Sequence, residues 1–127
     1  MPQLRIEYSA NLPVGDHLRP FALTLHHALA EIAATDVGAF KTRLSRLEDW
    51  VIGDGDARHA MFHVDVRLLT GRSDAVKQAV GQCVLDQAVK MLSDLADGRE
   101  VQVTVDISDM DRDHYQKQVI AGRGNIV

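Results

Sequence analysis

Two kinds of hydrophobic periodicity alternate along this chain, and their order constrains its fold more than any single motif does. Over residues 2–8, apolar and polar side chains alternate, which is the two-residue period of a strand with one buried face. Over residues 18–32, apolar positions recur at helical spacing, and Pro20 restricts the regular helix interior to positions beyond its first turn. A second extended segment, over residues 39–49, completes a β-α-β unit.

The second half of the chain repeats this order of elements. Turn residues 53–56 separate the halves, and residues 61–69 alternate again as a third strand. Ser73 can cap a following helix that we expect Gly98 to end, and residues 101–107 show the clearest strand pattern of the sequence. The tail from Asp109 is polar, with a break at residues 122–125, and we expect it to reach a neighbouring subunit or to fray.

The duplicated order predicts an α/β (α+β) fold in one domain, residues 1–127. Each β-α-β crossover should be parallel and right-handed, which places both helices on one face of a four-stranded sheet. The opposite face would be polar and uncovered, suited to a subunit interface or to a site built between subunits. Its predicted side chains are Arg5, Glu7, Lys41, Arg43, His63, Asp65 and Arg67. We therefore expect an oligomer.

Composition argues against several classes of protein. The net charge of -4 is spread among mixed signs without a run of lysine or arginine, so we expect no nucleic-acid partner. The sequence has neither a signal-like start nor an apolar stretch of the roughly 18 residues that span a bilayer, which predicts a cytoplasmic protein without a membrane partner. Its single cysteine, Cys83, lies in a helical apolar pattern, where core packing is favoured over a nucleophilic role.

The start of the chain carries the first chemical signal. Methionine followed by proline is a start from which Met1 is commonly removed, and its removal would leave Pro2 as a secondary amine. An α-amino group has a pKa of roughly 7.7 to 8.0, and burial beside cations lowers it, so that the amine can act as a base at neutral pH. The alternative is a chance Met-Pro start, because proline is harmless at the first position of a strand.

Two groups of cations supply the other signals. In Gly71-Arg72-Ser73 the glycine permits a tight turn and the serine caps a helix, so Arg72 would lie at a helix N-terminus, where a carboxylate can bind. The alternative is an exposed loop arginine. Lys41 and Arg43 share the polar face of the second strand, and either a solvated or subunit-bridging face or an anion site explains them.

In this order, the features resemble the tautomerase superfamily with its macrophage migration inhibitory factor-like fold, and within it the 5-carboxymethyl-2-hydroxymuconate isomerase family. The resemblance covers nearly the whole chain. The residues that carry it are Met1-Pro2 with Glu7, Trp50 followed by Gly53-Asp54-Gly55, His63 within residues 60–64, and Gly71-Arg72-Ser73. It implies a homotrimer without metal or organic cofactor, whose site between subunits isomerises a carboxylate-bearing dienol from the breakdown of aromatic acids to the conjugated ketone.

The resemblance also implies roles for single residues. Pro2 matches the catalytic proline, which would take a proton from the 2-hydroxyl and return it at carbon 5. Arg72 matches an arginine that would bind a substrate carboxylate or stabilise charge at the carbonyl oxygen. The family's other arginine falls on Lys41, which offers a point charge in place of a planar fork. Arg43, two residues on and on the same strand face, is the alternative ligand for that carboxylate.

Two other functions stay open at this point. A trimeric binding protein without catalysis would account for Lys41 at the position of the family's arginine. A metal-dependent enzyme would draw its ligands from His26, His27, His59, His63 and Asp65. The spacing disfavours a metal site, because adjacent histidines diverge around a helix and His63 with Asp65 lacks a third ligand nearby.

Overall fold

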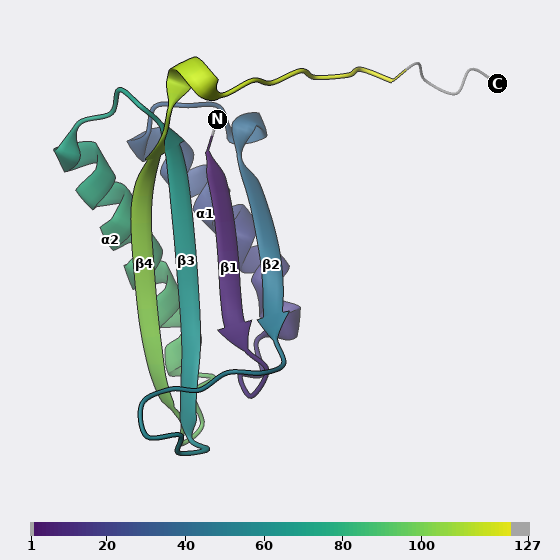
Figure 1. Ribbon diagram of the computed structural model, residues 1–127, viewed down its shortest axis with the longest axis vertical. Coiled ribbons are helices and arrows are strands. Elements are labelled where there is room, and N and C mark those ends of the chain that lie inside the picture. The colour runs from purple at the N-terminus through teal and green to yellow at the C-terminus, as the bar shows by residue number, and fades with distance from the viewer. Residues whose placement is uncertain (1, 123–127) are drawn as a thin grey trace.

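The two β-α-β units form a single four-stranded sheet in the computed structural model, which describes residues 2–122 (Figure 1). The first unit consists of β1 (Gln3–Ser9), α1 (Leu18–Ile32) and β2 (Lys41–Leu47), and the second of β3 (His59–Leu69), α2 (Asp74–Ser93) and β4 (Glu100–Met110). Short 3-10 helices lie at Gly15–His17, Val37–Ala39 and Arg112–His114. The duplicated order predicted from the sequence is therefore confirmed.

The strand order is β2-β1-β3-β4, with parallel pairing inside each unit and antiparallel pairing where the units meet. β1 and β3 are thus the central strands, and β2 and β4 form the two edges. Gln3 of β1 pairs with Lys41 on one side and Arg67 on the other, so the starts of β1 and β2 lie at the same end of the sheet as the end of β3.

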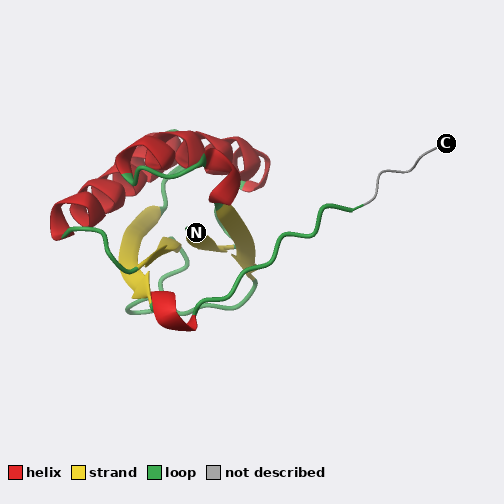
Figure 2. Cartoon of the chain, turned by 90° about the horizontal axis from the view of Figure 1, so that it is seen from above, coloured by secondary structure: helices red, strands yellow, loops and turns green. Residues whose placement is uncertain are grey.

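Both helices cover the same face of the sheet, as predicted (Figures 1 and 2). The side chains of Leu4, Ile6, Phe62, Val64 and Val66 on this covered face are fully buried. Phe21 of α1 meets Phe62 edge to face, with ring centroids 5.8 Å apart. The opposite face, which we call the open face, carries the polar side chains expected from the alternation, because successive residues of a strand point to opposite sides.

Helix α2 begins where the sequence predicts and ends earlier. The Ser73 hydroxyl accepts a hydrogen bond from the backbone N–H of Val76, which satisfies one of the free donors of the first turn. The helix ends at Ser93, not at Gly98. Gly98, with a φ of +77°, serves the turn into β4, and Asp97 before it also has a positive φ, so the chain has left helical geometry before it reaches the glycine.

The C-terminal segment continues further as ordered structure than its polar sequence predicts. β4 extends to Met110, which is only 4% exposed. The guanidinium of Arg112 then donates to the carbonyl of Thr70 at 2.9 Å, which holds the last 3-10 helix against the end of β3. Beyond Tyr115, residues 116–122 lead away from the body of the molecule (Figures 1 and 2). Most of the predicted break at residues 122–125 lies outside the described residues.

Candidate active site at one end of the sheet

Pro2 lies directly before β1, at the end of a central strand. Less than 2% of its surface is exposed. Its carbonyl accepts a hydrogen bond from the backbone N–H of Lys41 at 3.2 Å, which joins the start of β1 to the start of β2. The fold thus places Pro2 among buried groups at this end of the sheet.

Arg72 is anchored at the same end of the sheet. It follows Gly71, whose φ of +120° is a conformation that other residues rarely adopt. Its Nε donates to the carbonyl of Ala33 at 3.3 Å, and its Nη1 to that of Leu69 at the same distance. Ala33 caps the C-terminus of α1, where a cation is favoured. The exposed-loop interpretation of Arg72 is therefore wrong, since the side chain is half-buried and held in place.

The two strand cations take different positions on the open face. Lys41 bends back, and its Nζ donates to the carbonyl of Ala39 at 3.1 Å. Arg43 donates from Nη1 to the Oε1 atom of Gln3 at 2.7 Å. Neither cation forms an ion pair with a carboxylate among residues 2–122. Lys41 pairs with Gln3, the residue after Pro2, whereas Arg43 pairs with Arg5, two residues further along β1.

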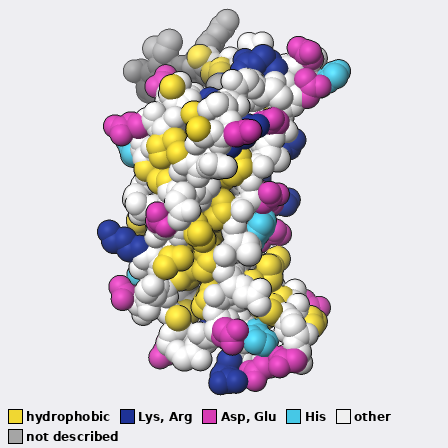
Figure 3. Space-filling model, turned by 90° about the vertical axis from the view of Figure 1, so that its left-hand side faces the viewer, with side chains coloured by type: hydrophobic (Ala, Val, Ile, Leu, Met, Phe, Trp, Pro, Cys, Tyr) yellow, Lys and Arg dark blue, Asp and Glu magenta, His cyan; other side chains and the backbone are white. Residues whose placement is uncertain are grey.

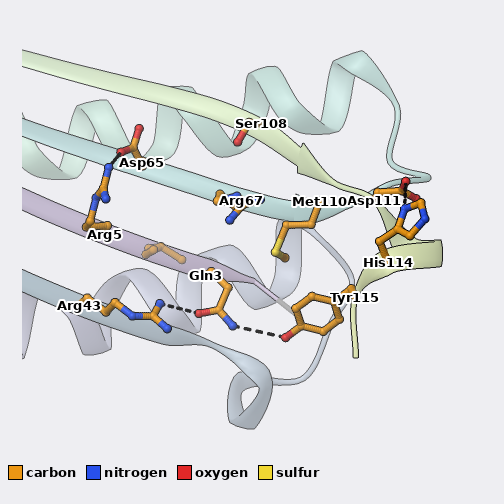
Figure 4. Close-up of a pocket in the computed structure, with 11 residues that line it drawn as sticks. Gln3, Arg5, Arg43, Asp65, Arg67, Ser108, Met110, Asp111, His114 and Tyr115 are labelled. Atoms are coloured by element: carbon orange, nitrogen blue, oxygen red, sulfur yellow. Dashed lines mark hydrogen bonds and ion pairs between the residues drawn. The ribbon is translucent and has the colours of Figure 1, made fainter. Parts of the chain in front are cut away.

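A depression of about 800 Å³ opens on this part of the open face (Figure 4). Strand residues Gln3, Arg5, Arg43 and Arg67 line it from one side, and Met110, Asp111, His114 and Tyr115 line it from the segment at the end of β4. Pro2, Lys41 and Arg72 do not line the depression, although Gln3 and Leu4 do. Of the predicted site residues, the structure therefore brings Arg43 into the depression and leaves the other three beside it.

A charged network crosses the open face and includes Arg5 and Asp65, which also line the depression. Arg5 donates to Asp65 at 2.8 Å, and the imidazole of His63 lies 2.9 Å from the same carboxylate and 2.6 Å from the hydroxyl of Thr104. Partial burial raises the pKa of Asp65, but the hydrogen bonds and charges of His63 and Arg5 outweigh it and leave that pKa below its usual value. Asp65 is therefore ionised at neutral pH, and Arg5 is neutralised by it.

Two further histidines, His26 and His59, have local partners. His26 on α1 lies 2.7 Å from the hydroxyl of Thr42 and stacks on Phe40, and burial lowers its pKa, with a smaller contribution from His27. His59 contacts Asp54 at 2.9 Å. Within the part of the chain that the structure describes, no group of three or more His, Cys, Asp or Glu side chains could hold a metal ion.

Cys83 lies on α2, half-buried against the core. Burial raises the pKa of its thiol, and the charge of Asp86 raises it further. A raised pKa disfavours the thiolate, which is the nucleophilic form, so the geometry agrees with core packing. Over residues 2–122, no helix is long and apolar enough to cross a membrane.

Sequence reasoning missed most of the residues that line the depression, among them Arg67, Gln3 and Tyr115. Arg67 was placed on the open face but not in a site, and drawing the antiparallel pairing of β1 with β3 would have set it beside Gln3. Gln3 itself looked like an ordinary strand residue. Tyr115, whose hydroxyl accepts from Gln3 Nε2 at 3.3 Å, comes from the C-terminal segment, and no local pattern indicated that this segment returns to β1.

Comparison with known proteins identifies a family. The model of the family described as 5-carboxymethyl-2-hydroxymuconate isomerase matches residues 2–123. No curated protein sequence matches the chain significantly.

Solved structures agree with the family match. A 5-carboxymethyl-2-hydroxymuconate isomerase from Deinococcus radiodurans R1 is 24% identical, with a TM-score of 0.83 over 92% of this chain and 88% of that one. A 5-carboxymethyl-2-hydroxymuconate delta-isomerase is 22% identical, with a TM-score of 0.80 over 94% and 88%. A fused 4-OT, solved as an asymmetric trimer, is 18% identical, with a TM-score of 0.71 over 91% of each chain. These likenesses establish the tautomerase-like fold predicted from the sequence.

Proposed function

The chain belongs to the 5-carboxymethyl-2-hydroxymuconate isomerase family and is an isomerase, and we propose that Pro2, freed by removal of Met1, is its proton-transferring group. One observation carries the proposal: Pro2 is fully buried at the end of a central strand, at the same end of the sheet as Lys41 and the anchored Arg72. A proline that only began an edge strand would need no such surroundings.

The environment of Pro2 favours a neutral amine. Its ring is buried, and burial disfavours the charged form of an amine. The positive charges of Lys41 and Arg72 at this end of the sheet act in the same direction. Both effects lower the pKa from the reference value of roughly 8 for an α-amino group, so that the nitrogen can accept a proton at neutral pH.

The proposed reaction moves one proton within the substrate. Pro2 takes the proton from the 2-hydroxyl of a carboxylate-bearing dienol, the electron pair shifts along the conjugated chain, and Pro2 returns the proton at carbon 5. The product is the conjugated ketone, and no cofactor is consumed. The N–H groups of Arg72 that do not bind Ala33 or Leu69 would hold a substrate carboxylate or the carbonyl oxygen. Lys41 or Arg43 would hold a second carboxylate.

The substrate class that we propose is an unsaturated di- or tricarboxylate such as 5-carboxymethyl-2-hydroxymuconate, formed in the breakdown of aromatic acids. Its support is the family match, together with two cations, Lys41 and Arg43, that no carboxylate of residues 2–122 neutralises. A monocarboxylate held by Arg72 would leave both of these charges unused.

We propose a homotrimer with the site at the boundary between subunits. The edge strand β4 is eleven residues long, and Val101, Val103, Val105 and Ile107 on its covered side are only partly buried. Figure 3 shows hydrophobic side chains along the α2 and β4 side of the molecule. A long edge strand with apolar side chains that are only partly buried favours pairing with another chain. The fused 4-OT that resembles this chain was solved as a trimer.

The test is the Pro2→Ala variant of the untagged protein. Intact mass first establishes that Met1 is removed, and the ultraviolet absorbance of a 2-hydroxymuconate-type dienol then measures ketonisation. General-base catalysis contributes roughly 100- to 10,000-fold, so we expect kcat/KM to fall by at least about 100-fold. Arg72→Gln should also lower kcat/KM, because it removes charge at the same end of the sheet.

Pro13→Ala is the matched control, because Pro13 is exposed in the loop that follows β1. It should keep full activity. A form with one residue inserted between Met1 and Pro2 should be as inactive as Pro2→Ala, since its proline nitrogen is an amide. If Pro2→Ala and the insertion form both ketonise the dienol at the wild-type rate, Pro2 is not the base.

A further inference from the structure

We infer that the depression on the open face binds a small dicarboxylate between the guanidinium groups of Arg43 and Arg67. This site shares Arg43 with the substrate-binding role proposed above, but it is independent of Pro2, because Pro2 does not line the depression and binding requires no proton transfer. It also assigns a function to Arg67, which takes no part in the reaction proposed above.

The charges that line the depression leave two arginines unneutralised. Its ionic side chains include Arg5, Arg43 and Arg67 against Asp65 and Asp111. Asp65 is bound to Arg5 at 2.8 Å, and Asp111 lies 2.6 Å from a ring nitrogen of His114. The acidic groups therefore already have partners, and none of them is left to balance Arg43 or Arg67.

The two remaining guanidinium groups are free for an anion. The Arg43 side chain is bonded only to the neutral amide of Gln3, and the Arg67 side chain makes no hydrogen bond or ion pair with any residue that the structure describes. Figure 4 shows Arg67 near the middle of the depression, beside Met110 and without a dashed line to any neighbour. A planar guanidinium without a partner is the group that best binds a carboxylate through two parallel hydrogen bonds.

The spacing of these arginines fits two carboxylates on one molecule. Arg67 pairs with Gln3 on β1, and Arg43 pairs with Arg5, so the two lie two strands and one side-chain step apart. With strands about 4.8 Å apart and a rise of about 3.3 Å per residue, their Cα atoms are roughly 12 Å apart. Both side chains are long enough to bend toward the space between them. One carboxylate at each guanidinium therefore requires a ligand with two acidic ends.

Neutral groups between the arginines complete the site. The side chain of Gln3 links Arg43 to the hydroxyl of Tyr115, with distances of 2.7 and 3.3 Å (Figure 4). Tyr115 directly follows the 3-10 helix Arg112–His114, and the bond from Arg112 to Thr70 helps to hold this segment near the sheet. Met110 lines the depression beside Arg67 and gives the carbon chain of a ligand an apolar contact (Figure 4). The depression thus offers charge at two points and a less polar middle.

Isothermal titration of the full chain with adipate, a saturated dicarboxylate, tests this site. We expect adipate to bind and hexanoate, with one carboxylate, to bind about tenfold more weakly or not at all, because hydrogen bonds to charged groups contribute about 1.5 to 3 kcal/mol. Arg67→Gln and Arg43→Gln should each weaken adipate binding about tenfold. Arg58→Gln is the matched control, because Arg58 is an exposed arginine bonded to Asp56, outside the depression.

The outcome separates this inference from the proposed function. Adipate cannot ketonise, so Pro2→Ala should bind it as the wild type does, whatever that variant does to turnover. Equal binding of adipate and hexanoate would overturn the inference. So would an Arg67→Gln variant that binds adipate normally. A changed mass of that variant in light scattering would then assign Arg67 to a subunit contact.

Discussion

The covered face and the open face of the sheet are built from the same strands, yet they differ in almost every physical property. In β1, Leu4 and Ile6 are completely buried beneath the helices, whereas Arg5 and Glu7, which alternate with them, form an ion pair of 3.9 Å on the open face. In β3, Val64 is buried while its neighbours His63 and Asp65 join a polar network. A two-residue period therefore assigns one set of residues to stability and the other to recognition.

This difference separates what the fold requires from what function requires. Apolar burial on the covered face supplies most of the stabilisation, because the hydrophobic effect scales with the apolar area removed from water. Ion pairs exposed on the open face contribute little, typically below about 1 kcal/mol. The open face can therefore carry charges suited to a ligand or a neighbouring subunit without endangering the fold.

The largest expected effect comes from truncating the covered face. Ile6→Ala should lower the free energy of unfolding by about 2 to 5 kcal/mol, because it removes buried methylene groups and leaves a cavity. Glu7→Ala, the adjacent open-face variant, should change it by less than about 1 kcal/mol. Urea unfolding at one fixed protein concentration measures both. Equal losses in the two variants would contradict the contrast between the faces.

An intermediate effect is expected at the start of α2, one of the two helices that cover the sheet. Ser73→Ala removes the oxygen that accepts from the N–H of Val76, and it should cost about 1 kcal/mol. Ser108→Ala, in an exposed position on the open face, should cost less than about 0.5 kcal/mol. Thermal unfolding compares them. If the two variants have the same Tm, the Ser73 cap does not stabilise α2.

The smallest expected effect concerns pH and the open face. Folding lowers the pKa of Asp65, so its contribution is present above the unfolded value of about 3.9 and disappears as the pH falls through the lower folded value. Asp65→Asn should therefore cost less than about 1 kcal/mol at neutral pH, and the difference from the wild type should shrink below about pH 4. Urea unfolding at pH 7 and pH 3 checks the sign. A difference that grows on acidification would contradict it.

Much of the fold could be predicted from the sequence, because the strand and helix periods are strong and local. The parallel crossovers and the single-sided placement of α1 and α2 followed from the handedness of β-α-β units. The predicted end of α2 is wrong by several residues. Gly98, which was expected to end the helix, lies in a later turn. The preference of glycine for positive φ values does not distinguish the end of a helix from a turn further along the chain.

The site was less predictable, because it depends on contacts between distant segments. The alternation placed Arg43 and Arg67 on the open face. It did not reveal that Arg67 would be left without a partner or that Tyr115 would return to Gln3. Arg72 was chosen for its position before a helix, yet its guanidinium is held by the end of the other helix at Ala33. Predicting such contacts requires the register of the strands and the path of the loops.

The strand order also has a consequence for how fast the chain can fold. Within residues 2–122, each strand pair encloses at least one whole helix: β1 and β2 enclose α1, β3 and β4 enclose α2, and β1 and β3 enclose α1 and β2. No pair can therefore begin as a local hairpin, and the entropy of closing a long loop must be overcome before any ladder forms. Such non-local pairing slows folding, and it leaves strand edges unpaired until the two halves of the chain meet.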